Sequence, residues 1–300
     1  SYYFKDLPPA PKEVLWLVLE WDWSVLTQDA LNNLLAAYQL WFASHQNNPD
    51  TWGLATKLEM RHEHTGNITL GIHYVDKEGE LNDLAPFDDF VDKMLTAIGL
   101  PATESLVPFH VVHLPPGTAG GRPIDSVSSA QAAARRLDWL ACQQTLNGSG
   151  DNQRGRYKSA YQKGEFSPHV LEAIWRALTW PDPDNHLTQS LIQIQSFGGQ
   201  INAASAPVRK ESSAAQRSSF LKWQPQCYWH GDSAAADQVH ADWIRGLYFN
   251  AFADAQGVPL NDAFEGCYIN YPDLDMTYKG GNPANGKNPQ WYKIFFPDLM

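Results

Sequence analysis

The residues that best suit chemistry lie in one short stretch near the end of the chain, Gly266–Met276, which reads GCYINYPDLDM. Two phenols and a carboxamide fall within four residues, at Tyr268, Asn270 and Tyr271. A phenol has an ordinary pKa of about 10, so it acts as a base only where donors or positive charge stabilise the phenolate. The same residues before Pro272 also fit an edge strand with one buried tyrosine. The residues alone leave both interpretations open.

A second group of candidates lies on the strand expected over 187–197. Strand alternation places Gln193, Gln195 and Phe197 on one face. The apolar Ile192 and Ile194 then take the other face. Two amides on one face could hydrogen-bond a ligand, or could lie on a solvated face of a sheet.

Other candidates have ordinary structural explanations beside the functional ones. Tyr228, with Trp229 and His230 after it, could line a pocket or pack in a core. His62 and His64 share a strand face and could bind a metal, as in a metal hydrolase. The sequence offers no evident third ligand for such a site, so a polar strand end is the preferred interpretation.

Composition limits the classes of function. The 300 residues carry a formal net charge of −11, which argues against a general nucleic-acid binder. The longest apolar run, Val14–Leu19, is too short for a membrane helix. The 3 cysteines suggest neither a disulfide scaffold nor a zinc site. The first and last residues look like the ends of a piece cut from a longer protein.

Hydrophobic patterning predicts the elements that must position these residues. The expected strands cover 12–23, a hairpin over 52–74, 106–114, 187–197 and 220–230. The expected helices follow Thr27, run from Pro86 to Gly99, cover 130–146, and start at Ser167 and Ser233. Hairpins joined to helical insertions predict an α+β fold, a large antiparallel sheet with helices packed over one face.

The motif Tyr268–Met276 and the aromatic run Trp291–Phe296 together resemble a known signature. It is the carboxyl-terminal Tyr-x-Asn-Tyr-x-Asp-x-Asp/Leu signature of the berberine bridge enzyme-like flavin oxidases. Upstream, Tyr157-Lys158-Ser159-x-Tyr161 is similar to that family's Lys-Ser-x-Tyr, and Phe197-Gly198-Gly199-x-Ile201 to its Gly-Gly-x-Ile strand end. The opening Tyr2-Tyr3-Phe4 resembles the strand after the flavin domain's glycine-rich segment. The likeness covers nearly the whole chain.

The resemblance implies the substrate-binding lobe of a vanillyl-alcohol-oxidase-type flavoprotein. Residues 1–262 would form the α+β substrate-binding domain, and residues 263–300 the carboxyl-terminal motif segment, truncated before its final helix. The FAD-binding domain of the family is absent from this chain. The implied partners are that missing domain and a small-molecule substrate, with neither nucleic acid nor membrane, and the fragment alone would be inactive.

The implied activity is hydride transfer from an alcohol, sugar or secondary-metabolite substrate to FAD, while a base removes a proton. By resemblance, Tyr271 is the base, and Tyr268 and Asn270 lie beside the flavin. The implied substrate-binding residues are Gln193, Gln195, Phe197 and Tyr228. Sugar oxidases of the family tend to carry an acid near the place of Gln195 and a His or Tyr near Phe197. This sequence departs from that pattern, which weakens the case for a sugar substrate.

The resemblance also raises a geometric question about the motif. In a strand, Tyr268 and Asn270 would point to opposite faces, so both reach one site only if the strand bends or ends, which Pro272 favours. Cys267 is not at the family's flavin-linking position and is expected to be a small buried group. Lys158 and Tyr161 are expected to be structural rather than catalytic.

One alternative keeps the fold without the chemistry. A non-catalytic binding or assembly module would explain the absence of any dinucleotide-binding segment in the sequence. Visible flavin absorbance of the full-length protein distinguishes the two hypotheses, because the module would be colourless.

Overall fold

One antiparallel sheet runs through the protein in the computed structural model, which describes residues 9–64, 66–105, 121–146, 153–203, 215–231 and 233–297. The strands follow the order β5-β4-β1-β3-β2-β9-β10-β7, and in addition β6 pairs with β1 and β8 with β10. The strands are β1 Glu13–Trp21, β2 Leu54–Arg61, β3 Ile68–Tyr74, β4 Ala102–Glu104, β5 Pro123–Ile124, β6 Arg135–Asp138, β7 Arg154–Tyr157, β8 Ala160–Gln162, β9 Ser190–Ser196 and β10 Leu221–Trp229.

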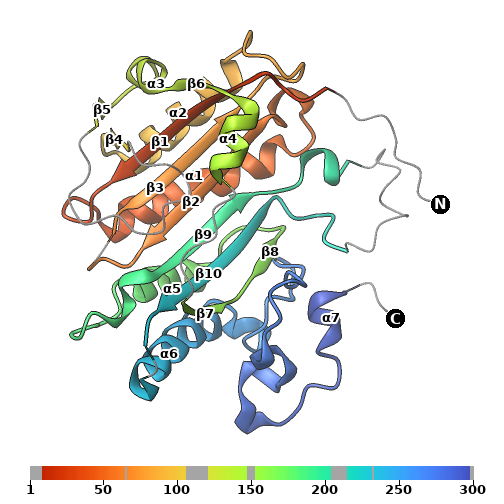
Figure 1. Ribbon diagram of the computed structural model, residues 1–300. Helices are drawn as coiled ribbons and strands as arrows, with labels where there is room; N and C mark the ends of the chain where they lie inside the picture. Colours follow the sequence, from red (N-terminus) through yellow and green to blue (C-terminus); the bar gives the residue numbers. More distant parts are fainter. Residues whose placement is uncertain are drawn as a thin grey trace.

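Four helices cover one face of this sheet (Figure 1): α1 Gln28–His45, α2 Ala85–Ile98, α5 Pro168–Leu178 and α6 Ala234–Ala251. Three of them begin at the side chains that the sequence suggested as caps, because Thr27, Ser167 and Ser233 each accept a backbone N–H of the first turn. The shorter helices are α3 Val127–Ala133, α4 Trp139–Leu146 and α7 Tyr292–Phe295. The α+β architecture predicted from the sequence is confirmed.

The strand β1 is buried on both faces, as its sequence predicts. Leu15, Leu17 and Leu19 pack in the large core that the four helices share with the sheet. Val14, Trp16 and Val18 point the other way and form a small second cluster with Cys142 of α4. The helix α4 therefore covers part of the opposite face of the sheet.

The prediction of one helix over 130–146 is wrong. The chain leaves the helix at Ala134, whose ψ of 140° is extended, and Arg135–Asp138 then pairs with the first half of β1 as strand β6. Pairing satisfies backbone groups that this part of β1 would otherwise expose at a sheet edge. The expected strand over 106–114 and the opening Tyr2–Phe4 lie outside the described residues.

The second face of the sheet is polar where β2, β9 and β10 lie side by side. Lys57 of β2, Gln195 of β9 and Lys222 of β10 are aligned in register across the three strands. Glu59, Gln193 and Gln224 form the next aligned row. These six residues define the polar sheet face. Their apolar neighbours along each strand point to the helices, so the alternation in the sequence separates a core face from a face that can meet a ligand.

The core behind the polar sheet face gives a test of the strand register. We expect Ile194→Ala to destabilise the protein by about 2–5 kcal/mol, because Ile194 is fully buried in β9 and its removal leaves a cavity. The matched control is Leu40→Ala on α1, where the side chain is 61% exposed and the cost should stay within about 0.5 kcal/mol. Urea unfolding of both variants measures the difference, and equal midpoints would contradict the assignment.

Candidate functional site

The motif residues 268–271 form a turn and not an edge strand. The N–H of Tyr271 donates to the carbonyl of Tyr268 at 3.0 Å. The turn follows Gly266, which has a φ of +101° and whose missing Cβ would lie 2.1 Å from the carbonyl oxygen of Ile294. Strand alternation therefore does not apply here. The rings of Tyr268 and Tyr271 lie with their centroids 5.4 Å apart, and the Asn270 amide donates to the Tyr268 hydroxyl at 2.7 Å.

The hydroxyl of Tyr271 is joined to the polar sheet face by two hydrogen bonds in series. It donates to Oε1 of Gln224 at 2.6 Å, and Nε2 of Gln224 donates to Oε1 of Gln195 at 2.8 Å. Tyr271 is half-buried, and burial, followed by the nearby Tyr157 and Tyr268, raises its pKa above the ordinary value. The phenol needs a positive charge nearby if it is to lose its proton near neutral pH.

Lys222 supplies that charge, and the sequence analysis did not single it out. Its Nζ lies 3.5 Å from the ring centroid of Tyr268, and 6.0 Å from that of Tyr271. Burial lowers the pKa of Lys222 to about 8, while contact with the face of a phenol favours the charged form. The signal was present in the sequence, because Lys222 and Gln224 are two residues apart on a predicted strand and so share a face.

A continuous row of aromatic rings borders the site. Each ring centroid lies within 6.4 Å of the next along the series Tyr228, Tyr157, Tyr271, Tyr268, Tyr161 and Phe197. The structure thus brings together Tyr271, Tyr268, Asn270, Gln195, Phe197 and Tyr228, with Gln193 in the neighbouring row of the polar sheet face. Burial raises the pKa of Tyr228, whose hydroxyl donates to Gln226 at 2.5 Å. Trp229 packs on His240 of α6 instead, with ring centroids 4.2 Å apart.

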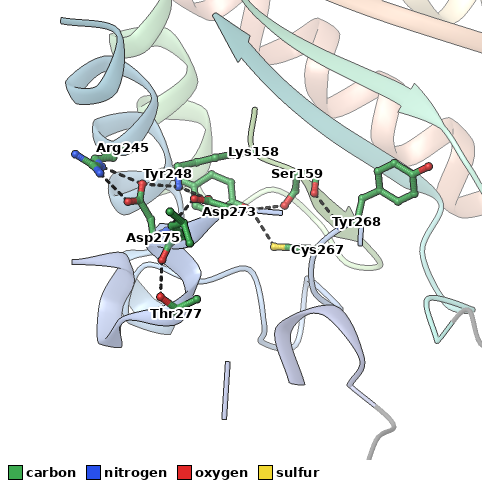
Figure 2. A network of polar contacts seen from close by, with 10 residues as sticks. Lys158, Ser159, Arg245, Tyr248, Cys267, Tyr268, Asp273, Asp275 and Thr277 are labelled. Atoms are coloured by element: carbon green, nitrogen blue, oxygen red, sulfur yellow. Dashed lines mark hydrogen bonds and ion pairs between the residues drawn. The ribbon is translucent and has the colours of Figure 1, made fainter. Parts of the chain in front are cut away.

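A buried cluster of charges lies directly after the turn (Figure 2). The side chain of Lys158 is 3% exposed, and its ammonium contacts both Asp273 and Asp275, the latter at 3.1 Å. Arg245 of α6 donates to both carboxylate oxygens of Asp275 at 2.9 and 2.7 Å. Burial alone would raise the pKa of Asp275, but Arg245 and Lys158 outweigh it and the pKa lies below the ordinary value.

The residue next to Lys158 contacts the other end of the turn. The hydroxyl of Ser159 accepts the N–H of Tyr268 at 2.8 Å, and its carbonyl accepts the hydroxyl of Tyr248 from α6. Burial raises the pKa of the Cys267 thiol to about 12, so that this sulfur is a small neutral group in the core. A cavity of about 560 Å³ opens beside the turn, lined by Tyr157, Tyr271 and Lys158 among others.

His62 and His64 do not form a metal site with any third group in the described part of the chain. Burial lowers the pKa of His62, and its Nε2 lies 2.8 Å from the carbonyl of Trp180. In the residues that the structure describes, no three His, Cys, Asp or Glu side chains gather as metal ligands. Within the same residues, no helix is both long and apolar enough for a bilayer.

The charge cluster gives a prediction about acid stability. The lowered pKa of Asp275 means that its contribution is present above the unfolded pKa, about 3.9, and is lost as the pH falls through the folded value. We expect Asp275→Asn to destabilise the protein at pH 7, on the order of 3 kcal/mol, and the deficit relative to wild type to shrink as the pH falls below about 4. The control is Asp254→Asn, an exposed carboxylate. Thermal melts across this pH range check it, and a deficit that does not change with pH would contradict it.

Comparison with curated proteins finds relatives that are longer than this chain, and no family model matches the sequence. Hexose oxidase of Chondrus crispus is 30% identical over 303 residues, which cover 96% of this chain and 53% of that protein. Aclacinomycin-N/aclacinomycin-A oxidase of Streptomyces galilaeus is 26% identical over 294 residues, 97% of this chain and 46% of that protein. The chain therefore spans about half the length of the curated relatives it matches.

Solved structures share the fold over the same extent. A flavoenzyme of caerulomycin biosynthesis matches with a TM-score of 0.74 at 22% identity, over 97% of this chain and 52% of that one. A glycopeptide hexose oxidase complexed with teicoplanin matches with a TM-score of 0.73 at 21% identity, over 97% and 51%. A berberine bridge enzyme-like protein of Physcomitrella patens matches with a TM-score of 0.58 at 14% identity, over 96% and 49%. Over nearly its whole length, the chain is thus similar to about half of each of these oxidases, and it shares its fold with about half of each of these flavoenzyme and berberine bridge enzyme-like structures.

Proposed function

We propose that this chain is the part of an FAD-dependent oxidoreductase that binds the substrate and provides its base, Tyr271. The single observation that supports this most is the position of the Tyr271 hydroxyl, 2.6 Å from Gln224 and beside the partly buried cation of Lys222. The activity requires an FAD-binding domain, and these 300 residues span about half of the relatives they match, so we expect them to be inactive without the rest of such a protein. Residues 1–262 form the substrate-binding domain in this proposal, and residues 263–300 the motif segment.

The turn has side chains that fit a flat flavin ring. Tyr268 presents a phenol, and the exposed Asn270 presents a carboxamide that can bond the polar edge of a heteroaromatic ring. Tyr268 and Asn270 would therefore hold FAD at this edge of the sheet. When bound, FAD supplies the acceptor for the hydride that leaves the substrate.

The residues of this chain manage the proton. As a phenolate, Tyr271 accepts the proton of the substrate hydroxyl, and the neutral phenol that results donates to Oε1 of Gln224, which fixes where its oxygen lies. A unit charge about 6 Å away stabilises a phenolate by about 3 kcal/mol at an effective dielectric constant of about 20, or two pKa units before solvent screening. In this proposal Lys222 counters part of the increase that burial causes in the pKa of Tyr271, which still lies above the ordinary value.

Among the three substrate classes that the family resemblance implies, we favour a sugar. The polar sheet face presents amides and charges that suit a polyhydroxylated molecule, and one curated relative is a hexose oxidase. The sequence analysis noted the absence of an acid near Gln195. Glu59 is aligned with Gln193 on the same face and places a carboxylate in the neighbouring row, where it pairs with Lys57 at 2.7 Å. Gln193, Gln195, Phe197 and Tyr228 would line this site.

Tyr271→Phe tests the base in the full-length, flavin-loaded protein. We expect the rate of flavin reduction by substrate to fall by about 10²-fold or more, because the substitution removes the phenol oxygen that takes the proton. Anaerobic stopped-flow absorbance measures that rate directly. Hexoses are the first substrates to test, followed by other alcohols.

The matched control for this variant is Tyr278→Phe, which removes the phenol oxygen from a ring that lies outside the aromatic row and that Lys287 covers at 4.0 Å from its centroid. It should leave the reduction rate unchanged. Unchanged reduction in Tyr271→Phe would remove Tyr271 from the mechanism. A colourless full-length protein would instead support the non-catalytic module.

Lys222→Met tests whether the positive charge of Lys222 helps Tyr271 to ionise, through the pH dependence of catalysis. Removing the positive charge raises the pKa of Tyr271, so the base ionises only at higher pH. We expect the acidic limb of kcat/KM to move up by about two pH units, with the largest loss near pH 7 and partial recovery as the pH rises. A pH profile that keeps its wild-type position would show that Lys222 does not act on the phenol.

A further inference from the structure

The short segment Tyr157–Tyr161 contacts the tyrosine turn and the residues after it with most of its side chains. The ring of Tyr157 lies 5.4 Å from that of Tyr271, and the ring of Tyr161 lies 6.4 Å from that of Tyr268. Between them, Lys158 contacts two carboxylates and Ser159 accepts a backbone N–H. One short connection between β7 and β8 thus contacts a motif more than 100 residues later in the chain, since Lys158 and Asp275 are 117 positions apart.

The turn has few supports of its own. One backbone hydrogen bond closes it, from Tyr271 to Tyr268, and Pro272 cannot donate a second. It is not part of any strand of the sheet, so no ladder fixes its position. Its side chains contact Gln224 and Lys222 of the polar sheet face, and the backbone on either side of it is held by Ser159 before the turn and by the Lys158 cluster after it.

A buried ion cluster is not an efficient way to gain stability. The cost of removing charges from water is large, and well-packed apolar residues of similar volume often give equal or greater stability. Charged contacts do impose distance and direction, because a displaced partner leaves a charge unpaired in a dry environment. The ammonium of Lys158 also lies 4.9 Å from the ring centroid of Tyr248, which limits its freedom further.

We propose that Lys158 is a positioning residue that holds Tyr271 in place through Asp273 and Asp275. The inference rests on the proposed function, since it gives the phenol of Tyr271 its catalytic purpose. With Ser159 fixed to Tyr268 on one side and Lys158 to Asp273 on the other, the hydroxyl of Tyr271 stays within reach of Gln224. Figure 2 shows the contacts of Lys158 and Ser159, with the ring of Tyr268 directed away from the cluster.

The test uses the full-length, flavin-loaded protein and three variants. Lys158→Met removes the charge and keeps an unbranched chain. Lys158→Met combined with Asp273→Asn also removes the carboxylate that would be left unpaired, and the Asn can still accept the N–H of Asp275. The matched control is Arg154→Met, which breaks the 2.6 Å pair to Asp237, another contact between β7 and α6 that does not involve the turn.

We expect Lys158→Met to lower the limiting rate of flavin reduction by about 10²-fold with substrate affinity nearly unchanged, because a displacement of about 1 Å at a base has an effect of this size. In the double variant, the melting temperature should recover while the rate stays low. Arg154→Met should keep the wild-type rate. If the rate recovers together with the melting temperature, Lys158 is purely structural and the inference is overturned.

Crystal structures give a readout that does not depend on activity. In the double variant we expect the Tyr271 hydroxyl to lie more than about 3.5 Å from Oε1 of Gln224, beyond hydrogen-bond reach. A turn that stays in its wild-type position overturns the inference. If the wild type reduces no flavin with any substrate, or Tyr271→Phe has no effect, the proposed function fails instead, and the crystal structures still decide whether Lys158 holds the turn.

Discussion

The site depends on the position of Lys222, whose ammonium is partly buried over phenol rings although removing a charge from water costs free energy. Lys222 lies 3.5 Å from the ring centroid of Tyr268, and burial lowers its pKa to about 8. The same burial raises the pKa of Tyr271. In this site each group alone is harder to charge than it would be in water. The low dielectric that causes this also strengthens the attraction between an ammonium and a phenolate, so the charged pair is stabilised. In the proposed mechanism, the two residues therefore serve proton transfer only when they are held together.

The sheet provides this arrangement because its two faces have opposite character. Along β9 and β10, apolar side chains pack under the helices while Gln195, Lys222 and Gln224 share the other face. Gln224 is only 7% exposed, and its amide is satisfied on both sides, by Tyr271 and Gln195. Because both the oxygen and the nitrogen of the buried Gln224 amide are hydrogen-bonded, the amide has little freedom to rotate. It therefore fixes the phenol oxygen more firmly than a water molecule would.

The sequence predicts what depends on local periodicity and misses what depends on distant partners. Alternation located β1, β9 and β10, and cap residues located the starts of α1, α5 and α6. The single helix expected over 130–146 failed because the unpaired edge of β1 recruits Arg135–Asp138, which no local pattern reveals. Lys222 was overlooked because a lysine on a strand ordinarily faces solvent, and the phenol nearest to it, Tyr268, lies in a turn that no local pattern places beside this strand.

The two buried lysines of the site illustrate how pairing decides what a charge can do. Lys158 is neutralised by Asp273 and Asp275, with Arg245 balancing the second carboxylate, so its field is largely cancelled and its contribution is geometric. Lys222 has no carboxylate partner within the residues that the structure describes, and its ammonium lies over the rings of Tyr161, Tyr268 and Tyr271. A carboxylate there would stabilise the ammonium and oppose ionisation of the phenol. Leaving one lysine unpaired makes its charge available to Tyr271, and the paired lysine keeps that tyrosine where the charge can reach it.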